Sequence, residues 1–177
     1  MRIVKTETKV YKYKELSDDA KETALEKLSD INVDYEWWEF TYEDAKTVLL
    51  KLESFDLDRN RHCTGGFIEA ADDTANAIIA EYGESCETFQ TATNYLEERR
   101  KLVEKYSDGI KTDEVAEDNE YDFDNECEDL DDEFLRSILE DYSIMLQHEF
   151  EYLTSEESIL ETIEANEYEF TKDGELS

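Results

Sequence analysis

Residues 129–153 of the 177-residue chain read DLDDEFLRSILEDYSIMLQHEFEYL, and this stretch decides the fold. Apolar residues recur in it at intervals of three and four, the period that places side chains on one face of an α-helix. The whole chain contains no proline, so nothing in the stretch interrupts a long helix. The sequence therefore predicts a helix over about 129–153. Its predicted buried stripe consists of Leu130, Phe134, Leu135, Ile138, Leu139, Tyr142, Met145, Leu146, Phe150 and Leu153.

The segment just before this helix has a different composition. Residues 107–128 read SDGIKTDEVAEDNEYDFDNECE, with few apolar residues and many acids. A segment of this kind cannot bury enough apolar surface to offset the entropy of ordering its chain. We therefore expect a mobile acidic segment at 107–128, preceded by an amphipathic helix at about 87–106.

Strand patterns lie further towards the N-terminus and at the C-terminal end. Residues 53–69 alternate apolar and polar residues around the Gly65-Gly66 pair, which predicts a β-hairpin with its loop near 60–62. Residues 2–13 are rich in Val, Thr and Tyr and also predict a strand. Residues 168–176 predict a short hairpin with an Asp-Gly turn.

Capping signals mark three shorter helices. They are predicted to begin after Ser17, at Asp72 or Asp73, and after Ser155. Helices thus outnumber strands, and no Pro-rich linker or internal repeat divides the chain. The predicted fold class is α+β, a mostly helical single acidic domain over residues 1–177 with a small antiparallel sheet.

The charge of the chain is strongly negative and unevenly distributed. Fifty Asp and Glu residues against 18 Lys and Arg residues give a formal net charge of −32. Residues 1–14 carry five bases and one acid, whereas residues 113–177 carry 25 acids and two bases. Self-repulsion at such a charge destabilises a compact state. General solubility or a salty habitat does not require a gradient of this kind, so the gradient favours a binding face.

The cysteines and the apolar runs indicate a compartment. Three cysteines form no close pair in the sequence, and no apolar run approaches the ~18 residues of a membrane span. The first residues lead into a strand pattern and not into the apolar core of a signal peptide. We expect a cytoplasmic protein with reduced thiols and no membrane partner.

Patterns that would carry chemistry are present only in part. Phe55-Asp56-Leu57-Asp58 resembles the Asp-x-Asp opening of haloacid-dehalogenase phosphatases, but Asn60 stands where that pattern needs Thr or Val. The same residues do not complete a calcium loop, because Arg61 occupies the position that needs Gly. His62 and Cys63 are adjacent, yet no second cysteine lies at zinc-binding spacing. We expect no catalytic residues, no metal and no cofactor, and a protein that is not an enzyme.

The acidic surface itself indicates a class of partner. A charge of −32 equals that of about 16 base pairs of duplex DNA, and carboxylates at i, i+3 and i+4 of a helix lie ~5–6 Å apart. Such an array would repel nucleic acid but engage the Lys and Arg side chains that bind phosphates. We therefore expect a basic nucleic-acid-binding protein as the partner, and no direct binding of nucleic acid. The predicted contact acids are Asp118, Glu120, Asp122, Asp124, Asp129, Asp131, Asp132 and Glu133.

An aromatic run, Tyr35 to Tyr42, adds a candidate apolar anchor. It falls in a helix predicted over about 34–51, where adjacent side chains diverge by about 100°, so Trp37 and Trp38 cannot easily both face the core. One of them then serves as a partly exposed anchor, of the kind enriched at interface hot spots. The alternative is that both border a wide apolar face.

Three stretches carry a resemblance to known proteins: residues 9–21 (KVYKYKELSDDAK), residues 55–59 (FDLDR), and the tail from residues 153–157 through 164–170. They resemble small acidic proteins of phages and mobile elements. In size and acidity the chain is similar to the type II anti-CRISPR proteins, which inhibit Cas9. The resemblance implies an inhibitor that acts in the host bacterial cytosol, mimics DNA in a basic channel of a Cas9-type effector and blocks DNA binding or cleavage. The resemblance has no catalytic signature, so it assigns no residue roles.

Two related functions remain as alternatives. The chain could be an antitoxin that neutralises a basic toxin, or an anti-restriction protein that mimics DNA. The sequence allows a homodimer and does not distinguish competition with DNA from a block of the nuclease movement.

Overall fold

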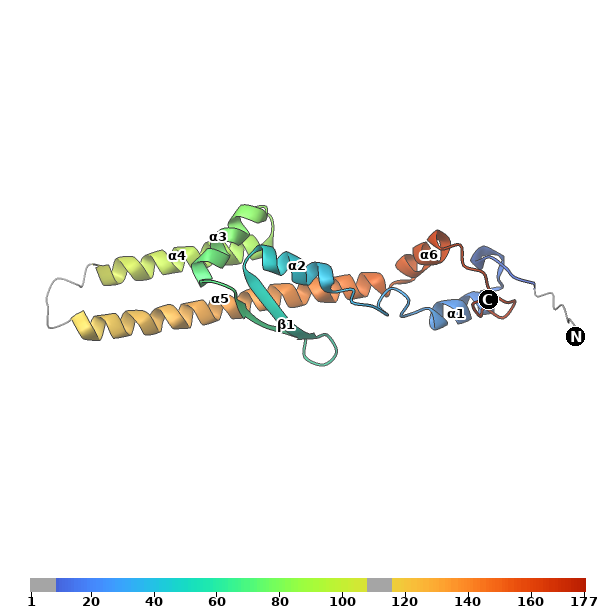
Figure 1. Ribbon diagram of the computed structural model, residues 1–177, viewed down its shortest axis with the longest axis horizontal. Helices are drawn as coiled ribbons and strands as arrows, with labels where there is room; N and C mark the ends of the chain where they lie inside the picture. The colour runs from blue at the N-terminus through green and yellow to red at the C-terminus, as the bar shows by residue number, and fades with distance from the viewer. Residues whose placement is uncertain (1–8, 108–115) are drawn as a thin grey trace, which may run out of the picture. The chain divides into compact units, whose positions relative to one another are not determined.

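Figure 1 shows the computed structural model, in which the backbone is described for residues 9–107 and 116–177 and the side chains for residues 9–107 and 121–177. The structure confirms the predicted class, α+β and mostly helical with a two-stranded antiparallel sheet. The elements in chain order are the 3₁₀-helix η1 (Tyr13–Glu15), α1 (Asp18–Lys27), α2 (Glu39–Thr47), β1 (Leu50–Asp56), β2 (His62–Phe67), α3 (Ala71–Glu81), α4 (Glu87–Ser107), α5 (Ala116–Leu153) and α6 (Glu156–Ala165).

The chain divides into two compact units. Residues 38–147 form the central unit, and residues 1–37 together with 148–177 form the terminal unit. Helix α5 contributes its residues up to Gln147 to the central unit and the remainder to the terminal unit. The sequence predicts that the whole chain forms a single domain. Whether the two units together form that domain stays a prediction.

The core of the central unit lies on the predicted stripe of α5. Phe134, Ile138, Tyr142 and Leu146 are all buried, at the helical spacing of four residues. The ring of Phe134 stacks on Tyr95 of α4, with 4.2 Å between ring centroids. The buried residues that the other elements add to this core include Val48, Leu50, Leu52, Ala75, Ile78 and Ala92.

Helix α5 begins much earlier than predicted. The predicted start at about residue 129 is wrong, because α4 ends at Ser107 and residues 116–128 already belong to α5. Residues 108–115 lie outside the described residues, and the mobility expected for the acidic segment at 107–128 stays a prediction. Half-buried Phe123 and buried Cys127 continue the apolar stripe backwards, and Phe123 packs against Tyr106 of α4 at 5.4 Å between centroids. These tertiary contacts stabilise a helical turn that the acidic composition alone does not favour.

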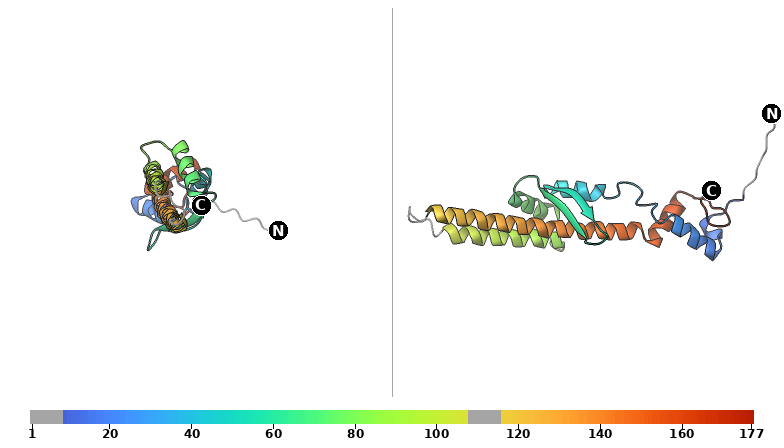
Figure 2. Two further views of the ribbon diagram at one scale, coloured as in Figure 1. Left: turned by 90° about the vertical axis from the view of Figure 1, so that its left-hand side faces the viewer. Right: turned by 90° about the horizontal axis from the view of Figure 1, so that it is seen from below.

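Helices α4 and α5 run antiparallel, side by side (Figures 1 and 2). The contacts between them pair rising numbers in α4 with falling numbers in α5. Thr91 contacts Asp141, and further along the pair Lys105 contacts Glu126. The predicted helix at about 87–106 is confirmed.

The predicted hairpin at 53–69 is confirmed, with an earlier start at Leu50. Its register pairs Leu50 with Phe67 and Asp56 with His62, and a bulge lies between Leu52 and Ser54. The helix predicted over 34–51 is shorter, because Leu49 adopts a left-handed φ of 62° that ends α2 and turns the chain into β1. Buried Leu50 and Leu52 belong to the strand for this reason.

Helix α3 does not use either predicted cap. Its N-cap is Ala70, which makes no side-chain cap hydrogen bond, and Asp72 and Asp73 lie in the first turn. There, carboxylates stabilise the helix through its dipole without capping it.

The terminal unit packs α1 against α6. Its core consists of Leu16, Ala20, Ala24, Ile159, Ile163 and Phe170. The predicted caps are confirmed: the Ser17 hydroxyl accepts from the Ala20 amide at 3.4 Å, and the Ser155 hydroxyl accepts from the Ser158 amide at 3.3 Å. Asn32 ties this unit together, donating to the Leu153 carbonyl and the Ser158 hydroxyl and accepting from Thr162.

The two terminal strand predictions have different outcomes. Of the strand expected at 2–13, residues 2–8 lie outside the described residues, and the remainder forms only an isolated bridge between Tyr11 and Phe170 before η1 begins. The Asp-Gly turn is confirmed, since Gly174 adopts a φ of 84° and Phe170 bridges to Leu176 across it. Within the part of the chain that the structure describes, no helix is both long and apolar enough to cross a membrane.

Candidate protein-binding surface

The predicted contact acids fall on α5. Asp118 and Glu120 lie in the helix, but their side chains are outside those described. Asp131 is half-buried, whereas Asp122, Asp124, Asp129, Asp132 and Glu133 are exposed. Glu128, which the sequence analysis did not select, is exposed among them. We call the six exposed residues the α5 acidic face: Asp122, Asp124, Glu128, Asp129, Asp132 and Glu133.

The bases of the neighbouring helix do not neutralise this face. Helix α4 contains four acids and four bases. Lys101 pairs with Glu98 and Arg100 with Glu104, both within α4. Lys105 and Arg99 reach across to α5, but they pair with Glu126 and Asp131. Among the described residues, no member of the α5 acidic face forms an ion pair.

Asp131 has a structural role at the inner edge of α5. Its Oδ1 accepts a hydrogen bond from the Tyr95 hydroxyl at 2.7 Å and another from Arg99 at 3.0 Å. Burial and the hydrogen bond to Asp131 raise the pKa of Tyr95 above its ordinary value, so the hydroxyl remains a donor. Asp131 therefore holds α4 on α5 and is not free for a partner.

The two tryptophans do not lie in a helix, because α2 begins only at Glu39. Trp37 is 6% exposed and packs against Phe150 in the terminal unit. Trp38 is half-buried and packs against Phe55 in the central unit. Trp37 therefore cannot serve as a surface anchor. The exposed aromatic residue of this run in the central unit is Phe40, with 82% of its surface accessible, which the expected helix over 34–51 did not single out.

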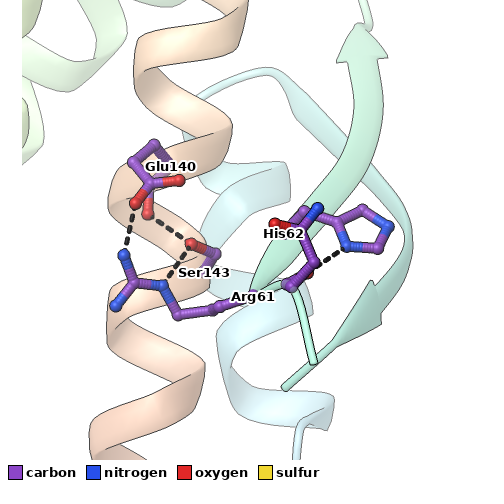
Figure 3. Close-up of polar contacts among 5 residues, drawn as sticks. Arg61, His62, Glu140 and Ser143 are labelled. Carbon is purple, nitrogen blue, oxygen red and sulfur yellow. Dashed lines mark hydrogen bonds and ion pairs between the residues drawn. The ribbon is translucent and has the colours of Figure 1, made fainter. Parts of the chain in front are cut away.

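The residues that the sequence offered as partial phosphatase, calcium and zinc patterns lie in the β1–β2 hairpin. Asp56 Oδ1 accepts from the backbone amide of Asp58 at 2.9 Å, which is an Asx turn. The Arg61 side chain donates a hydrogen bond to the Ser143 hydroxyl at 3.2 Å and forms an ion pair with Glu140, so it fastens the hairpin loop to α5 (Figure 3). The His62 side chain projects away from α5 and contacts the Asn60 carbonyl.

Cys63 faces away from its neighbour His62. The thiol is buried while the imidazole is exposed, because successive residues of a strand point to opposite faces. Burial, with Glu140 adding to it, raises the pKa of the Cys63 thiol to about 11. The thiol is therefore protonated at neutral pH, whereas a nucleophilic cysteine needs its thiolate.

A buried polar network connects α2, the end of α3 and α5. Asp44 accepts hydrogen bonds from the hydroxyls of Tyr82 and Tyr142, the second at 3.0 Å, and the two hydroxyls lie 2.7 Å apart. Burial raises the pKa of both tyrosines well above the ordinary value, so the hydroxyls stay protonated. These hydrogen bonds link α2 and the end of α3 to α5.

Asp141 gives a testable effect of pH on stability. Burial raises its pKa, Thr91 and Thr88 oppose the rise through hydrogen bonds, and Glu87 and Glu140 add to it. A folded-state pKa above the unfolded one contributes stability at low pH, and this contribution is lost as the pH rises through the folded-state pKa. We expect Asp141→Asn to be more stable than the natural chain at pH 7, with the difference shrinking as the pH falls towards about 4.

Urea unfolding at several pH values measures this difference. Asp129→Asn is the matched control, because it removes the same charge at an exposed position of the same helix. The burial effect is contradicted if Asp141→Asn stabilises no more than Asp129→Asn at pH 7.

Within the described ranges, no three His, Cys, Asp or Glu side chains are grouped so as to hold a metal ion. The candidate site is therefore the exposed acidic face of α5, which packs on α4, a helix with equal numbers of acids and bases.

Comparison with protein-family models, with curated proteins and with solved structures finds no match for this chain.

Proposed function

We propose that the chain is a binding protein that places the α5 acidic face in the nucleic-acid channel of a basic partner protein. The observation that carries the proposal is the set of six exposed carboxylates on one helix, none with an ion pair among the described residues. Unpaired like charges at helical spacing destabilise a helix by a few tenths of a kcal/mol per pair. A partner that supplies Lys and Arg side chains would remove this repulsion.

The charge density of the face fits a nucleic-acid channel. Asp122 and Glu133 are separated by about 16 Å along the helix axis at a rise of 1.5 Å per residue. Six charges over that length correspond to about one charge per 2.7 Å, between the ~3.4 Å of one DNA strand and the ~1.7 Å of a duplex. A groove built to bind phosphates would therefore meet a similar potential in this helix, and electrostatic steering would speed the encounter.

Contacts with α4 hold the helix that carries this charge. Tyr95, Arg99 and Lys105 of α4 all contact acids on α5. Charge fixed on a regular helix loses less conformational entropy on binding than charge on a mobile loop.

The partner we propose is a Cas9-type effector, on the strength of the resemblance to acidic phage proteins described above. Such an effector binds the guide–target heteroduplex in a positively charged channel. The binding would either displace target DNA or leave it bound and block the nuclease movement that precedes cleavage.

The test compares two variants with equal changes in charge. The face variant carries amides at Asp122, Asp124, Glu128, Asp129 and Asp132. The control variant carries amides at five exposed acids of the terminal unit that lack an ion pair within the described part of the chain, namely Glu22, Glu26, Asp30, Asp34 and Glu36. We expect the face variant to bind guide-loaded Cas9 about tenfold more weakly or worse at 0.15 M salt, since each exposed pair contributes ~0.2–1 kcal/mol. The control variant should bind like the natural chain.

Each result has a definite meaning. Displacement of labelled target DNA by the natural chain supports mimicry, and loss of cleavage with DNA still bound supports a block of the nuclease movement. Equal weakening of both variants would show that only net charge matters, which contradicts a role for the α5 acidic face. No binding of the natural chain at all would remove Cas9 as the partner.

A further inference from the structure

The antiparallel register of α4 and α5 brings two acids to a position where an ion pair is expected. Lys105 of α4 pairs with Glu126 of α5, with both carboxylate oxygens within 2.8 Å of Nζ. Seven residues make about two helical turns. Moving seven residues back along α4 and seven forward along α5 therefore reaches the next equivalent position, occupied by Glu98 and Glu133. One edge of the helix pair thus carries an ion pair and then, two turns on, two carboxylates.

A groove lies at this position. Its volume is about 260 Å³, and the residues that line it include Tyr95, Glu98, Leu130, Glu133, Phe134 and Ser137. Tyr95 and Phe134 are buried and Leu130 is half-buried, so they supply an apolar lining beneath the exposed carboxylates. The groove therefore combines an apolar floor with a carboxylate from each helix, and it borders the α5 acidic face through Glu133.

On the opposite edge of the α4–α5 pair, an arginine of the chain itself lies between the two helices. There, Arg99 extends from α4 beside Tyr95 and donates to Asp131 of α5 at 3.0 Å. At the groove edge, Glu98 pairs with Lys101 of its own helix at 2.6 Å, and Glu133 has no ion pair among the described residues. The chain fills one edge with its own arginine and leaves the other with excess negative charge.

We propose that this groove takes one arginine side chain of the partner. The inference rests on the proposed function, and it names the residue that the partner inserts. The methylenes of an arginine would lie on Leu130 and Phe134 while its charged end stays at the mouth. A planar guanidinium has donors enough to reach Glu133 and Glu98 together, whereas a lysine ammonium is a point charge that suits one carboxylate. The volume suits one long side chain and is below the usual range for small-molecule sites of about 300–1,000 Å³.

The test uses short peptides as probes, so it does not depend on the partner. Amide shifts of the full-length chain are followed by NMR during titration with acetyl-Gly-Ala-Arg-Ala-Gly-amide. The same peptide with lysine, and with neutral citrulline, serves for comparison. We expect the arginine peptide to shift amides around Glu98 and from Leu130 to Ser137, the lysine peptide to bind more weakly, and the citrulline peptide not to bind.

Two substitutions and one control make the test specific. Glu133→Gln removes the unpaired carboxylate and should weaken arginine-peptide binding about fivefold, close to 1 kcal/mol. Ser137→Leu narrows the groove without changing charge and should also weaken binding. Glu97→Gln removes the same charge from an exposed position of α4 that neither lines the groove nor belongs to the α5 acidic face, and it should leave the peptide's affinity unchanged.

The outcomes separate this inference from the proposed function. Equal affinity for the arginine and citrulline peptides, or an equal loss of affinity in Glu133→Gln and Glu97→Gln, would overturn the arginine site. The face variant keeps Glu133, so loss of Cas9 binding in that variant reports on the five other acids of the α5 acidic face and not on the groove. Peptide binding at the groove with no effect of the face variant on partner binding would overturn the proposed function and leave the groove.

Discussion

Replacing Gly174 with alanine is expected to destabilise the terminal unit by about 3 kcal/mol or more. Gly174 adopts a φ of 84°, where a non-glycine residue costs ~1–2 kcal/mol. A Cβ at this position would also lie 2.1 Å from the Ala20 carbonyl oxygen of α1. Neither backbone can yield easily, because the turn joins the bridged residues Phe170 and Leu176, and overpacking adds ~1–3 kcal/mol.

Amide hydrogen exchange in α1 and α6 measures this loss directly. Gly83→Ala is the control, since a Cβ at Gly83 would meet no atom within 4 Å. We expect Gly83→Ala to change the free energy of unfolding by no more than about 0.5 kcal/mol. Normal exchange protection in Gly174→Ala would contradict the close approach of the C-terminal turn to α1.

Replacing Gly65 with alanine is expected to cost the central unit about 3 kcal/mol. Gly65 lies in β2, and a Cβ there would fall 2.3 Å from the Lys51 carbonyl oxygen of β1 and 3.2 Å from Leu139 Cδ2 of α5. Within the described residues the sheet consists of these two strands, so a displaced backbone finds no third strand there to support it. The hairpin would separate from α5 or lose its register.

The neighbouring glycine is the matched control for this prediction. A Cβ at Gly66 would meet nothing within 4 Å, and alanine reduces the entropy of the unfolded chain. We expect Gly66→Ala to be neutral or to stabilise by up to about 1 kcal/mol. Urea unfolding of both variants measures the difference, and equal stabilities would contradict the close approach of Gly65 to the Lys51 carbonyl of β1.

Several features follow from the sequence because the interactions that form them are local. The spacing of Phe134, Ile138 and Tyr142 predicts the buried face of α5, which the structure confirms. Ser17 and Ser155 predict two helix starts, since a capping hydroxyl acts only three residues along the chain. The hairpin and the Asp-Gly turn likewise depend on residues that are neighbours in sequence.

Other features depend on residues that are distant in sequence, and there the sequence analysis was wrong or incomplete. The turns of α5 before residue 129 exist because Phe123 and Glu126 meet Tyr106 and Lys105 on α4. The sequence predicts one helix that holds both Trp37 and Trp38, but α2 begins only at Glu39 and Trp37 is buried against Phe150. Contacts across such separations leave no periodic signal in a single sequence.

The candidate site combines both kinds of information. By itself the sequence determined that an acidic, mostly helical α+β protein has its charge concentrated around the start of a long amphipathic helix. Only the tertiary structure decided which acids are available, because Asp131 and Glu126 are taken up by α4 whereas Asp129 and Glu133 are not. It also decided that Glu98 stands opposite Glu133, since this depends on the register of two antiparallel helices. That register is set by the packing of Tyr95 on Phe134, 39 residues apart in the chain and 4.2 Å apart between ring centroids.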